Sequence, residues 1–401
     1  MLHEDASRRE ELARRPDAAR RRGGPIKICW IIPTLDRGGA EKQLALLACG
    51  IDRAEFEPSV IALTRGGPYA QTLREAGVPV YEINKRAKLD PLALRRLRQL
   101  LIRLRPDVVH TWLFAANAYG RLAALRAGVP VVLGGERCVD PWKRGWELRI
   151  DRLLTRRTAG VLTNSTAVRD FYAAAGIDAA KFTVIPNGVE PAAPPRLSRE
   201  QALASLGLRP NSRFILSVGR LWPQKGYKDL IWAGGMACVV DPDLSYVVIG
   251  EGPQRPLLEQ FRDDTGGAEG VKLVGERSDA AELMPHCEMF WNGSLYEGQS
   301  NGILEAMRAG VAVIASDIPG NRELIEHGRD GMLYPPGAAD QLLKFTTLLK
   351  SDRQLRDSLA AAAQQKVARE FSVARMVRSH EQAYAAALAA GSGGAGRPGG
   401  S

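Results

Sequence analysis

Cysteine is scarce in this 401-residue chain, and its positions form no recognisable pattern. The five cysteines are Cys29, Cys49, Cys138, Cys238 and Cys287, and no two of them stand in C-x-x-C spacing. An odd number of isolated cysteines in a long chain favours neither a disulfide framework nor a zinc site. The pattern is typical of a protein from a reducing compartment.

Long apolar segments and targeting signals are absent as well. No uninterrupted apolar run approaches the roughly 20 residues that span a bilayer. Residues 1–25 lack the apolar core of a signal peptide, and their five acidic residues argue against an organelle transit peptide. We therefore expect this segment to be a disordered basic arm and the chain to be cytoplasmic.

The rest of the composition is that of an ordinary folded protein, with 45% hydrophobic and 25% charged residues. The length exceeds what a single hydrophobic core usually supports, so two domains are expected. The net charge of +10 is uneven, because residues 26–190 carry an excess of nine positive charges and residues 191–401 are close to neutral. Such a region can be a plain solvated surface, or it can attract an anionic membrane or an anionic acceptor.

From Ile26 onward, short apolar runs alternate with amphipathic stretches. The runs IKICWIIP, SVIALT and PDVVHT are each followed by a turn and a helical pattern. This alternation predicts an α/β fold, in which parallel sheets are covered by helices on both faces. It breaks once, at the proline-rich residues 187–201, and then resumes with RFILSVGR, SYVVIGEG and VAVIASD.

The pattern predicts two doubly wound parallel-sheet domains. We expect them at residues 26–190 and 209–371, with a linker at 191–208. A final helix at 372–390 and a flexible tail at 391–401 complete the chain. Because ligands bind at the carboxyl ends of the strands in such sheets, we expect the site in a central cleft that both domains face.

Two strand ends of the first domain carry candidate site residues. Gly38 and Gly39 open a helix after the first strand, where backbone can approach a ligand closely and helix amides favour an anion. An ordinary structural turn has the same sequence. The spacing is not G-x-G-x-x-G, so NAD binding is disfavoured. His110 ends the strand VVH, where its ring can bond a phosphate or a sugar hydroxyl, or simply cap the strand.

In the second domain, Arg220 and Lys225 lie on a glycine-bounded loop after the strand FILSV. Two fixed cations at that point can stabilise the charge of a leaving diphosphate.

A pair of acidic residues, Asp241 and Asp243, has the D-x-D spacing that can hold a divalent cation. It stands in a proline turn before its strand, however, and we interpret it as a turn. No metal is expected.

Glu297 and Glu305 stand eight positions apart around a loop that runs into the helical pattern ILEAMRAG. Glu297 precedes the helix and Glu305 lies inside it, so their carboxylates can contact opposite ends of one ligand. The loop amides between them, at Ser300, Asn301 and Gly302, can bind phosphate at the helix N-terminus. A pair of carboxylates in this arrangement suits the hydroxyl groups of ribose and of a hexose.

These motifs resemble those of glycosyltransferase family 4, the large retaining family with the GT-B fold. The matching segments run in family order over nearly all of residues 26–385, and they are GGAE, PDVVHT, IPNGV, VGRLWPQKG, VIGEGP and EGQSNGILEAMRAGVAVIASDIPG. The resemblance implies two Rossmann-like domains, a nucleotide diphosphate-sugar as donor, and a final helix that crosses back onto the first domain.

By this resemblance, Glu305 would hold the donor ribose. Glu297, on the donor hexose, and His110, beside the reacting sugar, would be the catalytic residues. Further assignments that it implies are Arg220, Lys225, Gly39, Ser300, Asn301 and Gly302 at the diphosphate, Gly38 and Gly39 at the acceptor or phosphate, Arg277 at the base pocket, and Asn187 in the hinge region. No cofactor is implied. One departure is that Gln299 and Ser300 follow the Glu-Gly pair, where family members often have a hydrophobic residue and then Pro or Gly.

Two basic stretches leave the choice of surface partner open. In residues 90–107, leucines at helical spacing predict an inward face, with the arginines pointing to solvent. In residues 142–157, Trp142 and Trp146 are interleaved with basic residues and can either touch lipid headgroups or lie on an ordinary surface helix. A saccharide or lipid-linked acceptor and an anionic membrane surface are therefore the candidate partners, and nucleic acid is not expected.

Two other functions remain as alternatives. A nucleotide-sugar epimerase can use the same fold, although the GGAE turn and the pair of glutamates speak against it. A non-catalytic scaffold that binds sugar nucleotides is the second, because a fold by itself does not guarantee activity.

Overall fold

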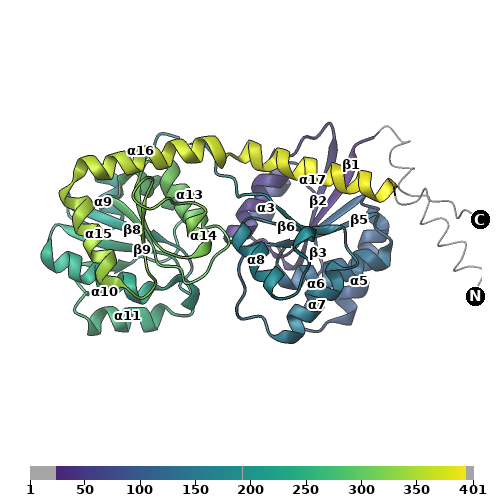
Figure 1. Cartoon of the computed structure of the whole chain (residues 1–401), viewed down its shortest axis with the longest axis horizontal. Coiled ribbons are helices and arrows are strands. Elements are labelled where there is room, and N and C mark those ends of the chain that lie inside the picture. Colours follow the sequence, from purple (N-terminus) through teal and green to yellow (C-terminus); the bar gives the residue numbers. More distant parts are fainter. Residues whose placement is uncertain (1–23, 192, 394–401) are drawn as a thin grey trace, which may run out of the picture. The chain divides into compact units, whose positions relative to one another are not determined.

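The computed structural model describes residues 24–191 and 193–393 (Figure 1). Nearly all of the expected arm at 1–25, and most of the expected tail at 391–401, lie outside the described residues. The described chain forms two compact units. Unit 1 contains residues up to Gly188 together with those from Val373 onward, and unit 2 contains Val189–Ser372.

Unit 1 is built on a seven-stranded sheet in the order β3-β2-β1-β4-β5-β6-β7, in which all pairs are parallel. Its strands are β1 (Ile26–Thr34), β2 (Phe56–Arg65), β3 (Val80–Glu82), β4 (Val108–Thr111), β5 (Val131–Glu136), β6 (Gly160–Thr163) and β7 (Phe182–Val184). Its helices are α3 (Gly39–Gly50), α4 (Pro68–Glu75), α5 (Pro91–Leu104), α6 (Leu113–Ala127), α7 (Gly145–Thr155), α8 (Thr166–Ala174), the short η1 (Ala179–Lys181) and α17 (Val373–Gly393).

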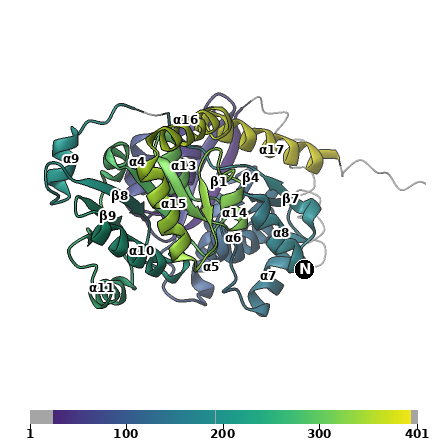
Figure 2. The same ribbon diagram turned by 60° about the vertical axis from the view of Figure 1, so that its left-hand side comes forward.

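The alternation of side chains along β1 separates the two layers of unit 1. Ile28, Trp30 and Ile32 pack into a core that includes residues of α3, α4 and α17. Cys29 and Ile31 point to the opposite face, into a core shared with α5 and α6. Figures 1 and 2 both show α17 on the other side of the sheet from α5 and α6.

Unit 2 has a six-stranded sheet in the order β10-β9-β8-β11-β12-β13, again with parallel pairs. Its strands are β8 (Arg213–Val218), β9 (Leu244–Ile249), β10 (Val271–Leu273), β11 (Met289–Asn292), β12 (Ala312–Ser316) and β13 (Met332–Tyr334). Its helices are α9 (Arg199–Ser205), η2 (Pro223–Lys225), α10 (Tyr227–Val240), α11 (Arg255–Asp264), α12 (Ala280–Leu283), η3 (Met284–His286), α13 (Asn301–Arg308), α14 (Pro319–Arg322), α15 (Ala339–Ser351) and α16 (Arg353–Glu370).

The same alternation divides unit 2 into layers. Phe214 and Leu216 of β8 pack into a core with residues of α9, α13 and the end of α16. Ile215 points the other way, into a core with residues of α10, α11 and α15. The prediction of two doubly wound parallel-sheet α/β domains is therefore confirmed.

Some local details differ from the expectation. The predicted linker at 191–208 contains α9, and its residues Ala202 and Leu203 are fully buried in the core of unit 2. On α5, Leu97 and Leu101 are buried as expected, whereas Leu94 is only partly buried. Within the described ranges 24–191 and 193–393, no helix combines the length and apolar character needed to cross a membrane.

Helix α17 is tied to the sheet of unit 1 by a buried tyrosine. It packs against α3, and the Tyr384 hydroxyl accepts a hydrogen bond from Trp30 Nε1 at 3.0 Å. The same hydroxyl lies 3.0 Å from Nδ1 of His110, at the end of β4. All three side chains are inaccessible to solvent. The C-terminal helix is thus joined to two central strands by a polar contact within an apolar core.

We expect Tyr384→Phe to destabilise unit 1 by about 1–3 kcal/mol, because the buried indole N–H of Trp30 loses its acceptor. Urea unfolding measures this change as a lower transition midpoint. The matched control is Tyr81→Phe, at a half-buried tyrosine of β3. Equal midpoints for the two variants would show that the hydroxyl of Tyr384 does not anchor α17.

Candidate active site

Three loops of unit 2 leave neighbouring strands at one edge of the sheet. They follow β8, β11 and β12, which are adjacent in the sheet order. Because the strands are parallel, all three loops emerge at the carboxyl edge, where open α/β sheets bind their ligands. The loops comprise residues 219–226, which include η2, residues 293–300, and residues 317–318, which lead into α14.

The first two loops are joined by an ion pair between Lys225 and Glu297. Both side chains are largely buried, with 19% and 9% of their surface exposed. Ser294 Oγ donates to Glu297 Oε1 at 2.9 Å, and Gln224 Nε2 donates to Glu297 Oε2 at 3.3 Å. The Glu297 carboxylate is therefore held by three donors from two loops. Sequence reasoning predicted Lys225 and Glu297 but missed Gln224 and Ser294.

Two glycines allow these loops to approach each other. Gly226 has a left-handed backbone with φ of +60°, and a Cβ on it would lie 2.1 Å from the carbonyl oxygen of Gly293. A Cβ on Gly320, in α14 directly after the third loop, would lie 2.3 Å from the carbonyl oxygen of Gly298. No larger residue fits at either point, so the position of Glu297 depends on glycine in the segments on both sides of it.

Helix α13 begins directly after the Glu297 loop. Ser300 is its N-cap and accepts from the backbone N–H of Ile303 at 3.5 Å, while Asn292 at the end of β11 donates to the same Ser300 hydroxyl at 3.2 Å. Glu305 is half-buried, and the spacing of Asn301 and Glu305 places them on one face of the helix. The N-terminal turn of α13 and the second glutamate thus share one side.

The remaining predicted residues of unit 2 have different surroundings. Arg220 is exposed, and its guanidinium lies 5.6 Å from the centre of the Trp222 ring. Arg277 is paired with Asp279 at 2.6 Å and donates to the carbonyl oxygen of Ser205 at 2.9 Å. The structure therefore places Arg277 in contact with the end of α9, and its assignment to a base pocket stays a prediction.

The acidic pair that we interpreted as a turn lies at the amino end of β9. Asp241 ends α10 and bonds to Arg213 and, at 3.0 Å, to Lys350. The backbone N–H of Asp243 donates to the Asp241 carboxylate at 3.3 Å. The pair is thus at the opposite edge of the sheet from the three loops, in the position that the sequence predicted.

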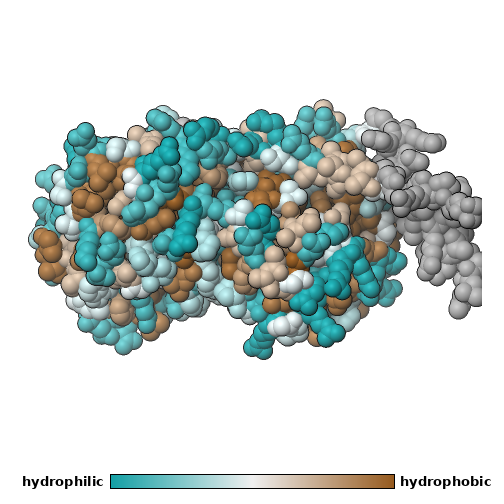
Figure 3. Space-filling view, in the orientation of Figure 1, coloured by the Kyte–Doolittle hydropathy of each residue, from teal (hydrophilic) through white to brown (hydrophobic). Residues whose placement is uncertain are grey.

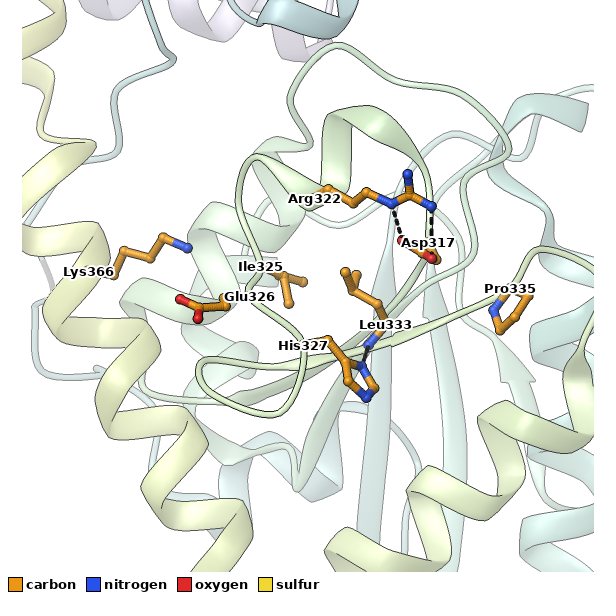
Figure 4. Close-up of a pocket in the computed structure, with 8 residues that line it drawn as sticks. All are labelled: Asp317, Arg322, Ile325, Glu326, His327, Leu333, Pro335 and Lys366. Atoms are coloured by element: carbon orange, nitrogen blue, oxygen red, sulfur yellow. Dashed lines mark hydrogen bonds and ion pairs between the residues drawn. The ribbon is translucent and has the colours of Figure 1, made fainter.

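A surface hollow lies beside the third loop (Figure 4). Its lining residues are Asp317, Arg322, Ile325, Glu326, His327, Leu333, Pro335 and Lys366. Asp317 and Arg322 form a two-point ion pair, and His327 Nδ1 accepts from the backbone N–H of Leu333 at 3.0 Å. None of the residues predicted to bind the donor lines it, so the Lys225–Glu297 group remains the better candidate site.

In unit 1, α3 starts at the predicted Gly-Gly turn. Gly38 is the extended N-cap and α3 begins at Gly39. The Glu41 side chain folds back onto Gly38, where a Cβ would lie 2.2 Å from its Oε2 atom. One turn later, the buried Gln43 side chain donates to the carbonyl oxygen of Gly188 at 2.8 Å and accepts from its N–H at 2.9 Å. Gln43 thereby fixes α3 to the point where the chain leaves unit 1.

His110 is enclosed completely. Its Nδ1 atom accepts from Trp112 Nε1 at 3.2 Å and contacts the Tyr384 hydroxyl. An indole nitrogen can only donate, so Nδ1 carries no hydrogen and the neutral ring is protonated at Nε2. That atom faces Gly135, where a Cβ would lie 2.9 Å away. Burial first, and then the neighbouring His380 and Arg137, hold the pKa of His110 well below its usual range.

The residues that enclose His110 were missed by the sequence analysis. His380 of α17 stacks on Trp112 with ring centres 6.3 Å apart, and burial followed by the charge of Arg137 lowers its pKa to about 3. The guanidinium of Arg137 lies 4.4 Å from the centre of the Trp112 ring and donates a hydrogen bond to the side chain of the predicted hinge residue Asn187. No local pattern marked these residues, because α17 is distant from β4 and β5 in the sequence.

The two halves of the chain each match a family of glycosyltransferases. Residues 37–193 match Glycosyltransferase Family 4, and residues 198–366 match Glycosyl transferases group 1. A phosphatidyl-myo-inositol mannosyltransferase of Mycolicibacterium smegmatis is 32% identical over 375 residues, which cover 88% of this chain and 92% of the relative. An Escherichia coli UDP-Gal:alpha-D-GlcNAc-diphosphoundecaprenol alpha-1,3-galactosyltransferase is 28% identical over 313 residues, covering 74% and 79%.

Solved structures support the fold. The crystal structure of Anabaena Alr3699/HepE in complex with UDP-glucose is similar with a TM-score of 0.80 and 24% identity, over 90% of this chain and all of that one. A glycosyltransferase from Rickettsia africae has a TM-score of 0.79 at 21% identity. The chain therefore belongs to glycosyltransferase family 4, has the GT-B fold, and transfers a sugar from a nucleotide-sugar donor.

Proposed function

We propose that the chain moves a hexose-type sugar from a nucleotide diphosphate-sugar to a cell-envelope glycan or lipid-linked sugar, with retention of anomeric configuration and without a metal. The observation that carries this proposal is the group formed by Lys225, Glu297 and the N-terminal turn of α13, at the carboxyl edge of unit 2. It combines a cation, a carboxylate and a helix N-terminus, which are the groups that a diphosphate-sugar requires.

The Lys225–Glu297 pair would be exchanged when the donor binds. The diphosphate carries more charge than one carboxylate, so it competes for the ammonium group of Lys225. Glu297 would then be free to accept hydrogen bonds from hydroxyl groups of the hexose, while Ser294 and Gln224 continue to orient it. With Arg220 as a second cation, the leaving diphosphate would be neutralised by the protein itself, and this is the basis for proposing metal independence.

The nucleotide would lie along α13. Its diphosphate would meet the amides of Ser300, Asn301 and Gly302, and the half-buried Glu305 on the same side would accept from the ribose hydroxyls. A carboxylate accepts two hydrogen bonds from a diol without losing its charge. Arg277 is retained as the residue proposed for the base pocket, where its guanidinium would have to leave Asp279 or contact the base from its present position.

We assign the acceptor to unit 1, with Gly38 and Gly39 at the start of α3. The positive charge of residues 26–190 suits an anionic acceptor. The names of two relatives point the same way, because one includes diphosphoundecaprenol and the other a phosphatidyl lipid. The central cleft predicted from the sequence depends on the placement of the two units and stays a prediction.

Retention is proposed from the resemblance to the retaining family 4, and the roles given to the carboxylates limit how it can occur. Both Glu297 and Glu305 are assigned to hydroxyl binding, which leaves neither as a covalent nucleophile. We propose instead a same-face, ion-pair-like step: the bond from the anomeric carbon to the diphosphate breaks, the acceptor oxygen attacks from the same side, and the departing phosphate takes the acceptor proton. The epimerase and the scaffold that the sequence left open differ from this transferase in their products, because the epimerase would release free sugar without an acceptor and the scaffold would release none.

The donor assignment predicts that one nucleotide diphosphate-sugar raises the melting temperature and that this rise survives chelator. Ligands stabilise a protein only through preferential binding to the folded state. Glu305→Ala should weaken donor binding at least tenfold, about 1.4 kcal/mol, because the ribose loses its acceptor. Thermal shift over a donor panel measures this effect, with Glu269→Ala, at an exposed glutamate of the same unit, as control.

Transfer must then be measured with the selected donor. Radiolabelled sugar should pass to an undecaprenyl diphosphate-sugar acceptor, and nuclear magnetic resonance should show the anomeric configuration of the donor in the product. Free sugar formed equally with and without acceptor would favour the epimerase, whereas donor binding without any turnover would favour the scaffold. An absolute requirement for a divalent ion would refute the metal-independent part of the proposal.

The enclosure of His110 favours a positioning role over contact with the sugar. The ring is neutral, packed between Trp112 and Tyr384, and inaccessible to solvent. It fixes the end of β4 and so the course of the chain into α6. Its predicted role as a catalytic residue stays a prediction, and it would require an opening of this cluster.

The buried histidines predict a pH dependence of stability. The pKa of His380 is lowered to about 3 in the folded chain, so between that value and the ordinary 6.5 only the unfolded chain binds the proton. Stability is therefore fully present above about pH 6.5 and is lost as the pH falls, by about 2 kcal/mol from pH 7.5 to 5 for this group alone. Urea unfolding of His380→Asn should show a pH dependence smaller by this amount, and an unchanged dependence would contradict the assignment.

A further inference from the structure

Four large apolar side chains are exposed at one edge of unit 1. Leu89 and Leu92 lie at the start of α5 with 87% and 64% of their surface exposed, and Trp142 and Trp146 lie at the start of α7 with 52% and 57%. The helices that follow parallel strands begin at the carboxyl edge of the sheet, so both pairs are at the edge where ligands bind. These four residues are called the apolar rim below.

The two halves of the rim are joined by α6, which packs against both α5 and α7. Figures 1 and 2 show these three helices together on one side of the sheet. The Tyr119 hydroxyl of α6 donates to the carbonyl oxygen of Lys88 at 2.9 Å and so holds the Leu89 segment. Phe114, at the start of α6, contacts Trp142 and Trp146 edge-on, with ring centres 6.1 Å and 6.3 Å away.

The exposure of the tryptophans is enforced by the residue between them. Lys143 has no exposed side-chain surface, and its ammonium group bonds to Asp151 at 2.9 Å, to Glu136 at 3.2 Å and to the Tyr172 hydroxyl at 2.6 Å. Turning Lys143 outward would leave two buried carboxylates without this partner, which is strongly unfavourable. With Lys143 fixed inward, its neighbour Trp142 is directed to solvent.

The rim is surrounded by positive charge. The exposed basic residues next to it are Arg86, Lys88, Arg95, Arg144 and Arg149. The nearby carboxylates of Asp90 and Glu147 accept backbone hydrogen bonds at the starts of α5 and α7. In the visible face of Figure 3, hydrophilic and hydrophobic residues alternate over this group of helices.

We propose that the apolar rim docks unit 1 on an anionic lipid bilayer. Tryptophan and leucine at the tips of helices insert into the headgroup region, while arginine and lysine around them are attracted by anionic lipids. Charge complementarity selects this partner, since the rim lies in the part of the chain that carries an excess of nine positive charges. The inference rests on the proposed function, because docking would bring unit 1 to the lipid-linked acceptor.

Flotation of the full chain with vesicles tests this proposal. The chain should bind vesicles of phosphatidylcholine mixed with phosphatidylglycerol, bind those of phosphatidylcholine alone at least tenfold more weakly, and dissociate as salt is raised. The double variants Trp142→Ser with Trp146→Ser, and Leu89→Ser with Leu92→Ser, should each lose at least tenfold in binding. The control is Val239→Ser with Val240→Ser, which removes an equally exposed apolar pair in unit 2.

Three further readouts decide the outcome. The rim variants should keep the melting temperature and the donor-induced thermal shift of the parent chain, which shows that they fold and that unit 2 is unaffected. Absence of vesicle binding by the parent chain, or equal binding by the rim variants, would overturn the proposal. Self-association that the rim variants abolish, without lipid binding, would identify a second copy of the chain as the partner instead. If vesicle binding holds while the donor screen fails, the proposed function falls and the rim remains.

Discussion

The ion pair between Lys225 and Glu297 determines the shape of the proposed donor site, because it joins the loop after β8 to the loop after β11. A largely buried ion pair is stable only when hydrogen bonds satisfy its remaining atoms. Ser294 and Gln224 supply them, and Gly226 and Gly320 allow the backbones to come close enough. The pair thus keeps the two loops together, and we propose that a diphosphate-sugar enters by placing a phosphate on Lys225 and hexose hydroxyls on Glu297.

Unit 1 uses a different kind of constraint. Its strand ends are held by uncharged aromatic groups, among which Tyr384 joins Trp30 and His110 inside an apolar core. Such a cluster fixes the direction of the chain after β4. The charged network around Lys143 acts on the surface of the unit instead. It keeps the ammonium group of Lys143 buried, while the neighbouring Trp142 is exposed to solvent. In our proposals, donor chemistry and surface recognition are thereby separated between the two units.

The sequence predicted the layered fold well, because buried parallel strands such as Ile26–Thr34 are continuous apolar runs that need no tertiary information. It also predicted that Lys225 and Glu297 follow strands of the second sheet, as they do in the structure, and their role at the donor stays a prediction. It could not predict that Lys225 contacts Glu297, which is 72 positions away, or that Tyr384 lies on His110 across 274 positions. Gln224 and Ser294 were missed because neither residue type is distinctive by itself, and only the folded loops bring them to one carboxylate.

The central claim is that the donor replaces the Lys225–Glu297 ion pair. A crystal structure of the chain with the nucleotide diphosphate-sugar that gives the largest thermal shift tests this claim most directly. The account predicts Lys225 Nζ within hydrogen-bond distance of a phosphate oxygen, Glu297 on the hexose hydroxyls, and Glu305 on the ribose. A donor bound elsewhere, for example in the hollow beside Asp317 and Arg322, with the Lys225–Glu297 pair intact, would contradict it.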